Sequence, residues 1–425
     1  MAAGTAGIRC PAAVSRRRGG PALWWDRRVT DTALLSRLRA DTPGCLTQVH
    51  LNNAGSALPP SVVLDAVTAH LRREAEIGGY EAAAEADDRL QSVYSSLGRL
   101  VGAPASSIAL TSSATDSFLR AFLSVPFEAG DRVLVAQSEY ASNVIPVLQA
   151  TRRLGITVEA IPDGADGALD PEALRGMLDE RVKLVSIVHA PSHNGLLNPA
   201  EAVGQVLRAS GSEAWYVLDA CQSVGQMPLD LAAIGADFLS ATGRKFLRGP
   251  RGTGFLALSD RALALEPGLL DLHSAEWVDD DEFTVADGGR RYEQWERSPA
   301  LLLGLGAAAD YALGLGLGTT RDLITGAADR IRAGLAEIPG VVVRDRGSVR
   351  TGIVVFTVDG RAAADVHRAV KAAGVNVSLS PPDYALRDFR AQAIEGQVRV
   401  SPHVYTDDGD IDALLAAVRE TVVAG

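Results

Sequence analysis

The chain has 425 residues, of which 47% are hydrophobic and 22% charged, a composition and length typical of a globular protein with two domains. Its formal net charge of −11 argues against a nucleic-acid partner, and no apolar run is long enough to predict a membrane span. The three cysteines, Cys10, Cys45 and Cys221, have neither metal-ligand nor disulfide-framework spacing, so we predict no metal site and a cytoplasmic location.

Residues 1–43 differ in composition from the rest of the chain. Residues 1–25 contain Arg9 and a run of three arginines that ends at Arg18, but no acidic residue, and glycine and proline are frequent. The segment lacks the apolar core of a secretory signal, and it favours a disordered extension or an upstream translation start over a transit peptide. Within it, a short helix is predicted from Thr30 to Arg39.

Residues 44–65 are predicted to form an N-terminal segment that packs on the C-terminal domain. His50 to Ala57 predicts a strand followed by a turn of small residues, and a helix is predicted over 61–74. Small residues let a ligand approach the backbone closely, although an ordinary strand-to-helix turn explains the pattern equally well.

A second turn of small residues, Leu110 to Ser117, precedes a helix predicted over 118–125. Such a turn exposes backbone N–H groups at the positive end of a helix dipole, which favours an anion-binding site. An N-cap without a ligand is the alternative.

Two buried parallel strands are then predicted to end in opposite charges. One apolar run ends at Asp219, and a second, Asp237 to Thr242, leads into a turn that carries Lys245. Ligands bind at this edge of open α/β sheets. A lysine opposite an aspartate is what a pyridoxal phosphate enzyme needs, because the amine forms a Schiff base and the carboxylate keeps the pyridine nitrogen protonated. A strand-end aspartate and a surface lysine without this function are the alternative.

The C-terminal part has a different pattern. Residues 276–289 are acidic and predict an exposed loop, and helices are predicted over 300–318 and 321–338. Four short strands, within 341–401, are then interleaved with helices over 362–373 and 409–422, which predicts a compact α+β domain. We therefore assign 66–310 to a large domain and 311–425 to a small one.

Three runs carry a resemblance to a known family. Asp219-x-x-Gln222, Thr242-Gly-Arg-Lys245 and the glycine-rich stretch from Gly249 to Gly254 resemble the signature of the class V aminotransferases. This group of fold-type I pyridoxal phosphate enzymes includes cysteine desulfurases, selenocysteine lyases, isopenicillin N epimerase-like proteins and C–S lyases. The resemblance extends from about His50 to the C-terminus. It implies an α/β fold with a mostly parallel sheet in the large domain, pyridoxal 5′-phosphate as cofactor, and a homodimer.

The resemblance also implies roles at the cofactor. Lys245 is the catalytic lysine, Asp219 pairs with the ring nitrogen and Gln222 with the ring hydroxyl. The other implied cofactor contacts are Ala114, Thr115, Thr242 and Arg244 at the phosphate, Tyr140 stacked on the ring, Ser192 near the ring hydroxyl, and Ser298 or Arg291 reaching the phosphate of a neighbouring subunit.

For the substrate, the resemblance implies that Arg399 holds the α-carboxylate of an amino acid, beside the turn at Asn53 and Ala54. An exposed strand arginine is the alternative. His193 is considered as an extra acid or base, and a solvated loop histidine is the favoured interpretation.

The chain departs from the desulfurase pattern. Tyr140 and Arg244 replace histidines, and the segment from Pro381 to Arg390 contains no cysteine where desulfurases carry their nucleophile. Cys221 is interpreted as an inert core thiol. Without a thiolate no persulfide can form, so we favour β-elimination of the C–S lyase type.

Two alternatives stay open for the same fold: an aminotransferase or amino-acid epimerase, and a cofactor-binding scaffold without turnover. A nucleotide-binding oxidoreductase is not supported, because no Gly-x-Gly-x-x-Gly follows a strand and opens a helix.

Overall fold

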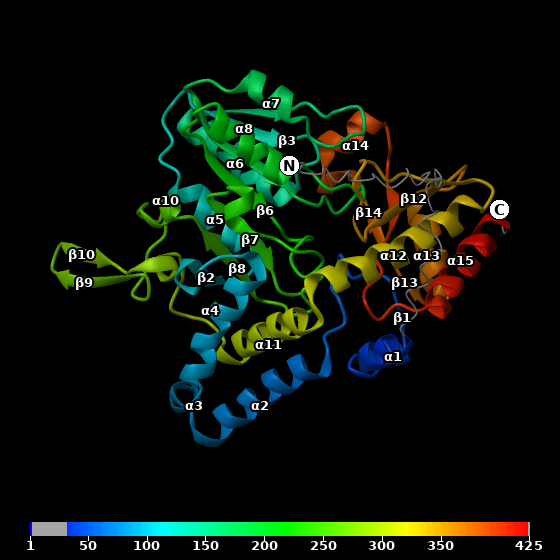
Figure 1. Cartoon of the computed structure of the whole chain (residues 1–425), viewed down its shortest axis with the longest axis horizontal. Helices are drawn as coiled ribbons and strands as arrows, with labels where there is room; N and C mark the ends of the chain where they lie inside the picture. The colour runs from blue at the N-terminus through cyan, green and yellow to red at the C-terminus, as the bar shows by residue number, and fades with distance from the viewer. Residues whose placement is uncertain (2–31, 424–425) are drawn as a thin grey trace.

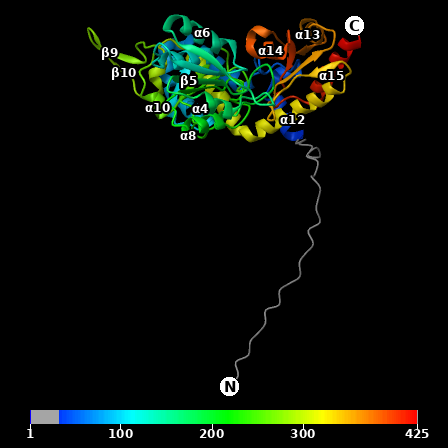
Figure 2. The same ribbon diagram turned by 90° about the horizontal axis from the view of Figure 1, so that it is seen from above.

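The computed structural model describes Met1 and residues 32–423, and the predictions for residues 2–31 lie outside this range. A large domain and a small C-terminal domain lie side by side (Figures 1 and 2). The helix predicted from Thr30 to Arg39 is present as α1 (Thr32–Ala40). Its residue Leu38 is buried, and Arg39 donates to Asp410 at 2.8 Å. The predicted extension over 1–43 is therefore corrected in its last part, because this ion pair ties α1 to the C-terminal helix.

The large domain is built on a seven-stranded sheet in the order β2-β8-β7-β6-β5-β3-β4. All neighbouring strands are parallel except those that pair with β8, which runs antiparallel to both β2 and β7. The predicted mostly parallel sheet is confirmed. The strands are β2 (Ile108–Thr111), β3 (Arg132–Ala136), β4 (Thr157–Ile161), β5 (Val182–Val188), β6 (Trp215–Asp219), β7 (Phe238–Thr242) and β8 (Gly254–Leu258).

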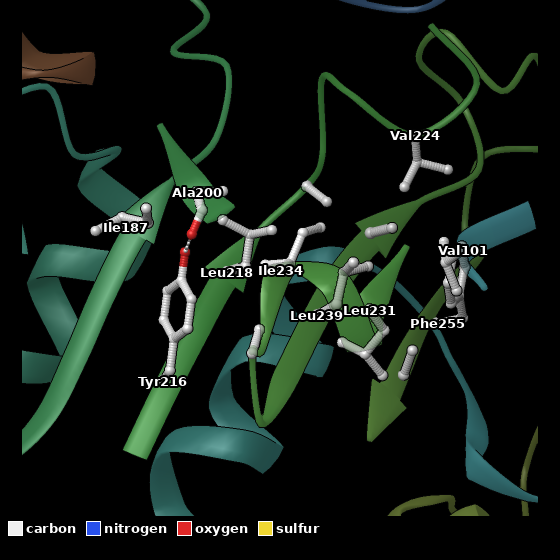
Figure 3. Close-up of a cluster of buried hydrophobic side chains, with 14 of the residues drawn as sticks. Val101, Ile187, Ala200, Tyr216, Leu218, Val224, Leu231, Ile234, Leu239 and Phe255 are labelled. Carbon is white, nitrogen blue, oxygen red and sulfur yellow. Dashed lines mark hydrogen bonds between the residues drawn. The ribbon is translucent and has the colours of Figure 1, made fainter. Parts of the chain in front are cut away.

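Side chains of this sheet alternate between two hydrophobic cores, as the period of a strand requires. In β6, Tyr216 and Leu218 belong to one core, whereas Trp215 and Val217 belong to the other. Figure 3 shows the first core, in which the Tyr216 hydroxyl donates to the Ala200 carbonyl at 3.0 Å. Because both faces are covered, the central strands are apolar at most of their positions.

Helices cover both faces of the sheet. One core contains residues of α4 (Asp87–Val101), α7 (Pro171–Met177), α8 (Ala200–Ala209), α9 (Leu231–Ile234) and α11 (Pro299–Leu315). The other contains residues of α5 (Ala114–Ser124), α6 (Ala141–Leu154) and α10 (Asp260–Leu263). The remaining elements of this domain are α2 (Ser61–Ile77), α3 (Gly79–Glu85), η3 (Ala105–Ser107) and η4 (Gly288–Tyr292).

The acidic segment predicted as a loop is an exposed antiparallel hairpin, β9 (Ala275–Asp279) and β10 (Glu282–Val285). It projects from the large domain on the side away from the small domain (Figures 1 and 2). This segment has no core pattern in the sequence because β9 is largely exposed, and neither strand contributes to the hydrophobic cores of the described residues.

The small domain is an α+β unit, as predicted. Its antiparallel sheet has the order β11-β12-β15-β14, and β1 pairs in parallel with β13. The strands are β1 (Val49–His50), β11 (Val341–Val343), β12 (Val354–Val358), β13 (Val375–Asn376), β14 (Ser378–Ser380) and β15 (Gln397–Val400). The helices and turns are η2 (Pro43–Leu46), α12 (Leu317–Ala336), α13 (Ala363–Ala372), η5 (Pro382–Tyr384), α14 (Leu386–Gln392) and α15 (Asp408–Val423).

The two domains are joined through α11 and α12, which meet at an angle of 83°. Within the described residues, neither these nor any other single helix is long and apolar enough to cross a membrane; α11 and α12 reach that length and composition only as a bent pair.

Candidate active site

A cavity of about 270 Å³ lies at the carboxyl edge of the central sheet. Strands β2, β3, β5, β6 and β7 all run toward this edge, so the residues that follow them meet there. The cavity is lined by Ala114, Thr115, Tyr140, Ser192, Asp219, Gln222, Thr242, Arg244 and Lys245, together with Ser113, Ser142, Asn143, Val188, Ala190 and Cys221. The structure thus brings together all the predicted cofactor residues except Ser298.

Lys245 is held on a tight turn that follows β7. The Gly249 N–H donates to the Gly243 carbonyl at 2.7 Å, and a Cβ at Gly243 would lie 2.3 Å from Thr253 Oγ1, so no side chain fits there. The Lys245 Nζ lies 6.0 Å from the centre of the Tyr140 ring. The amine and the aromatic ring therefore face the same cavity.

Asp219 ends β6 and is 5% exposed. Its two carboxylate oxygens accept hydrogen bonds from the Cys221 N–H at 2.9 Å and from Asn143 Nδ2 at 2.9 Å. The two donors fix the orientation of the carboxylate at the edge of the cavity. Cys221 lines the same cavity, but burial, and next the charge of Asp219, raise the pKa of its thiol to about 12. The prediction of an inert thiol agrees with this environment.

Gln222 provides an unpaired acceptor. Its Nε2 donates to the Ala54 carbonyl at 3.0 Å, whereas its buried Oε1 has no hydrogen-bond partner. A buried acceptor without a donor is costly, and a ligand hydroxyl would satisfy it. This orphaned atom, beside an aspartate and a lysine, fits the ring of pyridoxal phosphate.

Another part of the cavity lining suits an anion. Helix α5 begins at Ala114, with the Ser113 side chain as its N-cap, so the first N–H groups of the helix border the cavity. The helix starts four residues earlier than predicted because Ser113 accepts from the Asp116 N–H at 3.1 Å. Arg244 adds a cation and is anchored by a hydrogen bond to the Gly55 carbonyl. A phosphate is compatible with this set of donors.

Arg399 lies in β15 and is buried, and none of the described acidic residues pairs with it. It donates to the Ser192 carbonyl at 3.2 Å and to Asn52 Oδ1 at 3.1 Å, and its Nε finds no acceptor within the described part of the chain. Burial lowers its pKa to about 10. The residue is only 6% exposed, which excludes the alternative of an exposed strand arginine. A buried cation with free donor capacity fits a substrate carboxylate.

The turn predicted beside the substrate is present, but the Asn53 side chain has a structural role. Its Nδ2 donates to the Ser401 carbonyl at 2.7 Å, and its Oδ1 accepts from the Tyr405 hydroxyl. Ala54 contacts the site through its carbonyl, which Gln222 binds. The residue that faces Arg399 is Asn52, one position earlier, which the turn pattern alone did not single out.

Ser298 does not reach this cavity. It caps α11 and borders a separate cavity of about 1000 Å³, together with Tyr80, Trp295 and Arg297. Arg291, the alternative to Ser298, donates to the carbonyls of Ala286 and Leu263. Within one chain, neither residue contacts the Lys245 cavity.

Sequence reasoning missed two buried networks next to the site. His193 is 1% exposed and pairs with Asp388 at 2.8 Å, so the expected solvated histidine is wrong. Glu139 is also buried and is bonded to Asn143 at 2.8 Å. The one available signal was the spacing of Glu139 and Asn143 by four residues at the start of a helix.

Comparisons with known proteins agree with this geometry. A family model described as aminotransferase class-V matches residues 49–414. A "Probable cysteine desulfurase 2" from Mycobacterium leprae is 31% identical over 409 residues, which cover 90% of this chain and 96% of that protein. The apo structure of a cysteine desulfurase from Thermococcus onnurineus NA1 superposes with a TM-score of 0.85 at 25% identity, covering 92% and 98% of the two chains.

The fold is also similar to that of the cystine C–S lyase C-DES, solved with its reaction product cysteine persulfide. The TM-score is 0.80 at 22% identity, with 89% of this chain and 99% of that chain covered.

Proposed function

This chain belongs to the class V aminotransferase family and is a pyridoxal-phosphate-dependent enzyme, and we propose that it is a C–S lyase acting on a sulfur-containing α-amino acid. In the proposed reaction a β-elimination breaks the bond between Cβ and sulfur. The sulfur leaves as a thiol or persulfide, and the remaining carbon skeleton hydrolyses to pyruvate and ammonia.

The observation that carries this proposal is the segment from Pro381 to Arg390, which contains no cysteine. It forms η5 and α14, and Asp388 fixes it by accepting from His193, Asn194 and Arg346. Cys221, which does border the cavity, has a raised thiol pKa and is not a nucleophile. With no thiolate to accept sulfur among the described cavity residues, elimination is the favoured route for C–S cleavage.

Roles at the cofactor follow from the lining of the cavity. When bound, pyridoxal phosphate supplies an electron sink for charge that develops at the substrate α-carbon. Asp219 would keep the ring nitrogen protonated, and Gln222 Oε1 would accept from the ring hydroxyl. The start of α5, with Thr242 and Arg244, would hold the phosphate, and Tyr140 would lie against the ring.

Roles at the substrate follow in the same way. Arg399 binds the α-carboxylate, with Asn52 and Ser192 orienting the guanidinium. Lys245 removes the α-proton with its Nζ, as a general base. Tyr140 has no imidazole with which to move protons, so Lys245 is the base we assign.

A panel of amino acids tests the reaction type. The holoenzyme is incubated with cysteine, cystine, S-alkyl cysteines and their sulfoxides, and with alanine as a control that lacks a leaving group. Pyruvate, ammonia and the sulfur product in equal amounts are expected for at least one sulfur compound, and none for alanine. Conversion of the cofactor to its pyridoxamine form identifies an aminotransferase, inversion at Cα an epimerase, and no change with any compound a scaffold; each of these results rejects the proposal.

We further propose a homodimer in a reducing, cytoplasmic compartment. The cavity at Ser298 is bordered by Tyr80 and Trp295, which are 80% and 50% exposed, and such aromatic residues are typical of interfaces. The two described cysteines, Cys45 and Cys221, are buried and free. Light scattering of the holoenzyme tests the dimer, and a monomeric mass at micromolar concentration would reject it.

A further inference from the structure

A second buried carboxyl group, that of Glu139, is linked through Asn143 to Asp219 of the candidate active site. Asn143 Nδ2 donates one hydrogen bond to Asp219 Oδ2 at 2.9 Å and another to Glu139 Oε1 at 2.8 Å. All three residues are buried, with exposed fractions of 4% for Asn143, 5% for Asp219 and 3% for Glu139. Since both neighbours accept, the amide nitrogen must face them, and its two protons are both used.

The two carboxyl groups differ in their hydrogen bonding. Each Asp219 oxygen accepts from a donor, whereas Glu139 accepts at Oε1, from Asn143 and from the Tyr140 N–H at 3.1 Å, and the Val188 backbone N–H also lies close to this carboxyl group. Glu139 Oε2 is buried, and among the described residues no donor reaches it with hydrogen-bond geometry. A negative charge on an unpaired buried oxygen is far more costly than a neutral carboxyl there, and a second anion this close to Asp219 would add repulsion.

We propose that Glu139 is a positioning residue that works as an uncharged carboxyl group. It accepts one amide proton of Asn143 and thereby holds the other on Asp219, which remains the only anion of the pair. Burial, and next the charge of Asp219, raise the pKa of Glu139 to about 8, in agreement with a protonated group at neutral pH.

Other ionisable groups near the pair do not replace Glu139 in this role. They are Tyr140 at the N-cap of α6, His189 after β5, Cys221 after β6, and Arg244 and Lys245 after β7. Burial lowers the pKa of His189 to about 4, and burial raises that of Cys221 to about 12. Neither group changes its charge near neutral pH, so a titration near pH 8 that depends on residue 139 can be assigned to Glu139.

The proposal predicts a specific order of affinity for pyridoxal phosphate among substitutions of Glu139. Glu139→Gln keeps an acceptor for Asn143 and adds no charge, so the affinity for pyridoxal phosphate should stay within about twofold of the wild type. Glu139→Ala removes the acceptor and frees Asn143 to turn away from Asp219. The loss of one buried hydrogen bond should then weaken cofactor binding about tenfold.

The experiment is reconstitution of the apo-protein with pyridoxal phosphate, followed by absorbance and by quenching of tryptophan fluorescence. The absorbance of the bound cofactor is then titrated from pH 6 to 9. A step near pH 8 is expected in the wild type and should be missing in Glu139→Gln. Far-UV circular dichroism of each apo variant shows that it is folded.

An infrared difference spectrum, wild type minus variant, reports the protonation of Glu139 directly. It does not require Glu139→Ala to be folded. At pH 7, the carbonyl band of a protonated carboxyl should be present in the wild type and absent in Glu139→Gln. Glu293→Gln is a matched control, because the buried Glu293 accepts from Tyr94, His273 and Arg297 and is a paired carboxylate. That substitution should leave the band in place.

Two results would overturn the inference: a missing carboxyl band in the wild type, or cofactor binding weakened as much by Glu139→Gln as by Glu139→Ala. The inference rests on the proposed placement of Asp219 at the cofactor ring, which Asp219→Asn tests separately. If Asp219→Asn leaves cofactor affinity and absorbance unchanged, the placement fails and the inference fails with it. If Asp219→Asn is damaging and the Glu139 variants do not follow the expected order, the inference alone fails.

Discussion

Replacing Arg399 with methionine should weaken substrate binding strongly without destabilising the protein. Burial lowers the pKa of Arg399 from its usual 12.5 to about 10, because no acidic group compensates the charge. That difference corresponds to about 3 kcal/mol of destabilisation at neutral pH. The guanidinium donates two hydrogen bonds, to Ser192 and Asn52, and each contributes about 1 kcal/mol. The free energy of unfolding of apo Arg399→Met should therefore rise by about 1 kcal/mol.

The effect on substrate should be much larger and opposite in sign. Losing the partner of a buried carboxylate costs about 2 to 5 kcal/mol, so the KM for the amino acid should rise by about 30-fold or more. Urea unfolding of the apo-protein and initial rates of pyruvate formation measure the two effects. Arg332→Met is the matched control, because Arg332 is buried in the same domain but is paired with Asp345 at 2.5 Å. It should lose about 3 kcal/mol of stability and keep its KM.

The effect of Arg399 on the free energy of unfolding depends on pH, with a defined sign. A cation whose pKa is lowered in the folded state destabilises the protein at every pH below that folded value, and the cost falls as pH rises through it. The stability difference between Arg399→Met and the wild type should thus be constant from pH 6 to 9 and shrink above about pH 10. An Arg399→Met variant that loses 2 kcal/mol or more, or that keeps its KM, would refute the reasoning.

Lys245→Ala should show no covalently trapped cofactor after borohydride reduction. Its rate of elimination, measured as pyruvate formation, should fall by about 10³-fold or more. A covalent adduct on another residue would contradict the assignment. Asp388→Asn should lower the unfolding free energy by about 3 kcal/mol, because it removes the charge paired with His193 and Arg346. The control Asp383→Asn, at an exposed position, should have no effect. Equal melting curves for the two variants would count against the network. Cys221→Ala should keep elimination within about twofold of the wild type, since a thiol of pKa about 12 is no nucleophile, and mass spectrometry should find no persulfide on the protein after turnover.

Local patterns in the sequence predicted the elements that position the site. The apolar runs that end at Asp219 and Thr242 are buried on both faces of the sheet, and continuous hydrophobicity is the signal of such strands. The exposed β9–β10 hairpin was missed because it contributes to no core, and hydrophobic periodicity reports only burial.

The sequence by itself determined the chemistry of the large domain: a lysine, an aspartate and a glutamine at strand ends, and a small-residue turn at the start of a helix. These groups meet because parallel strands end at one edge, which is a rule of local geometry and connection. The chain also determined what is missing, a cysteine between Pro381 and Arg390.

Only the tertiary structure decided the protonation and the pairing of the buried groups. Arg399 pairs with no described acidic residue because β15 places it against Asn52 and Ser192, which are distant from it in sequence. Glu139 is held near Asp219 by an amide, and its environment raises its pKa. Such properties depend on the distance between charges and on the exclusion of water, which arise when distant segments pack together and which no local pattern of residues encodes.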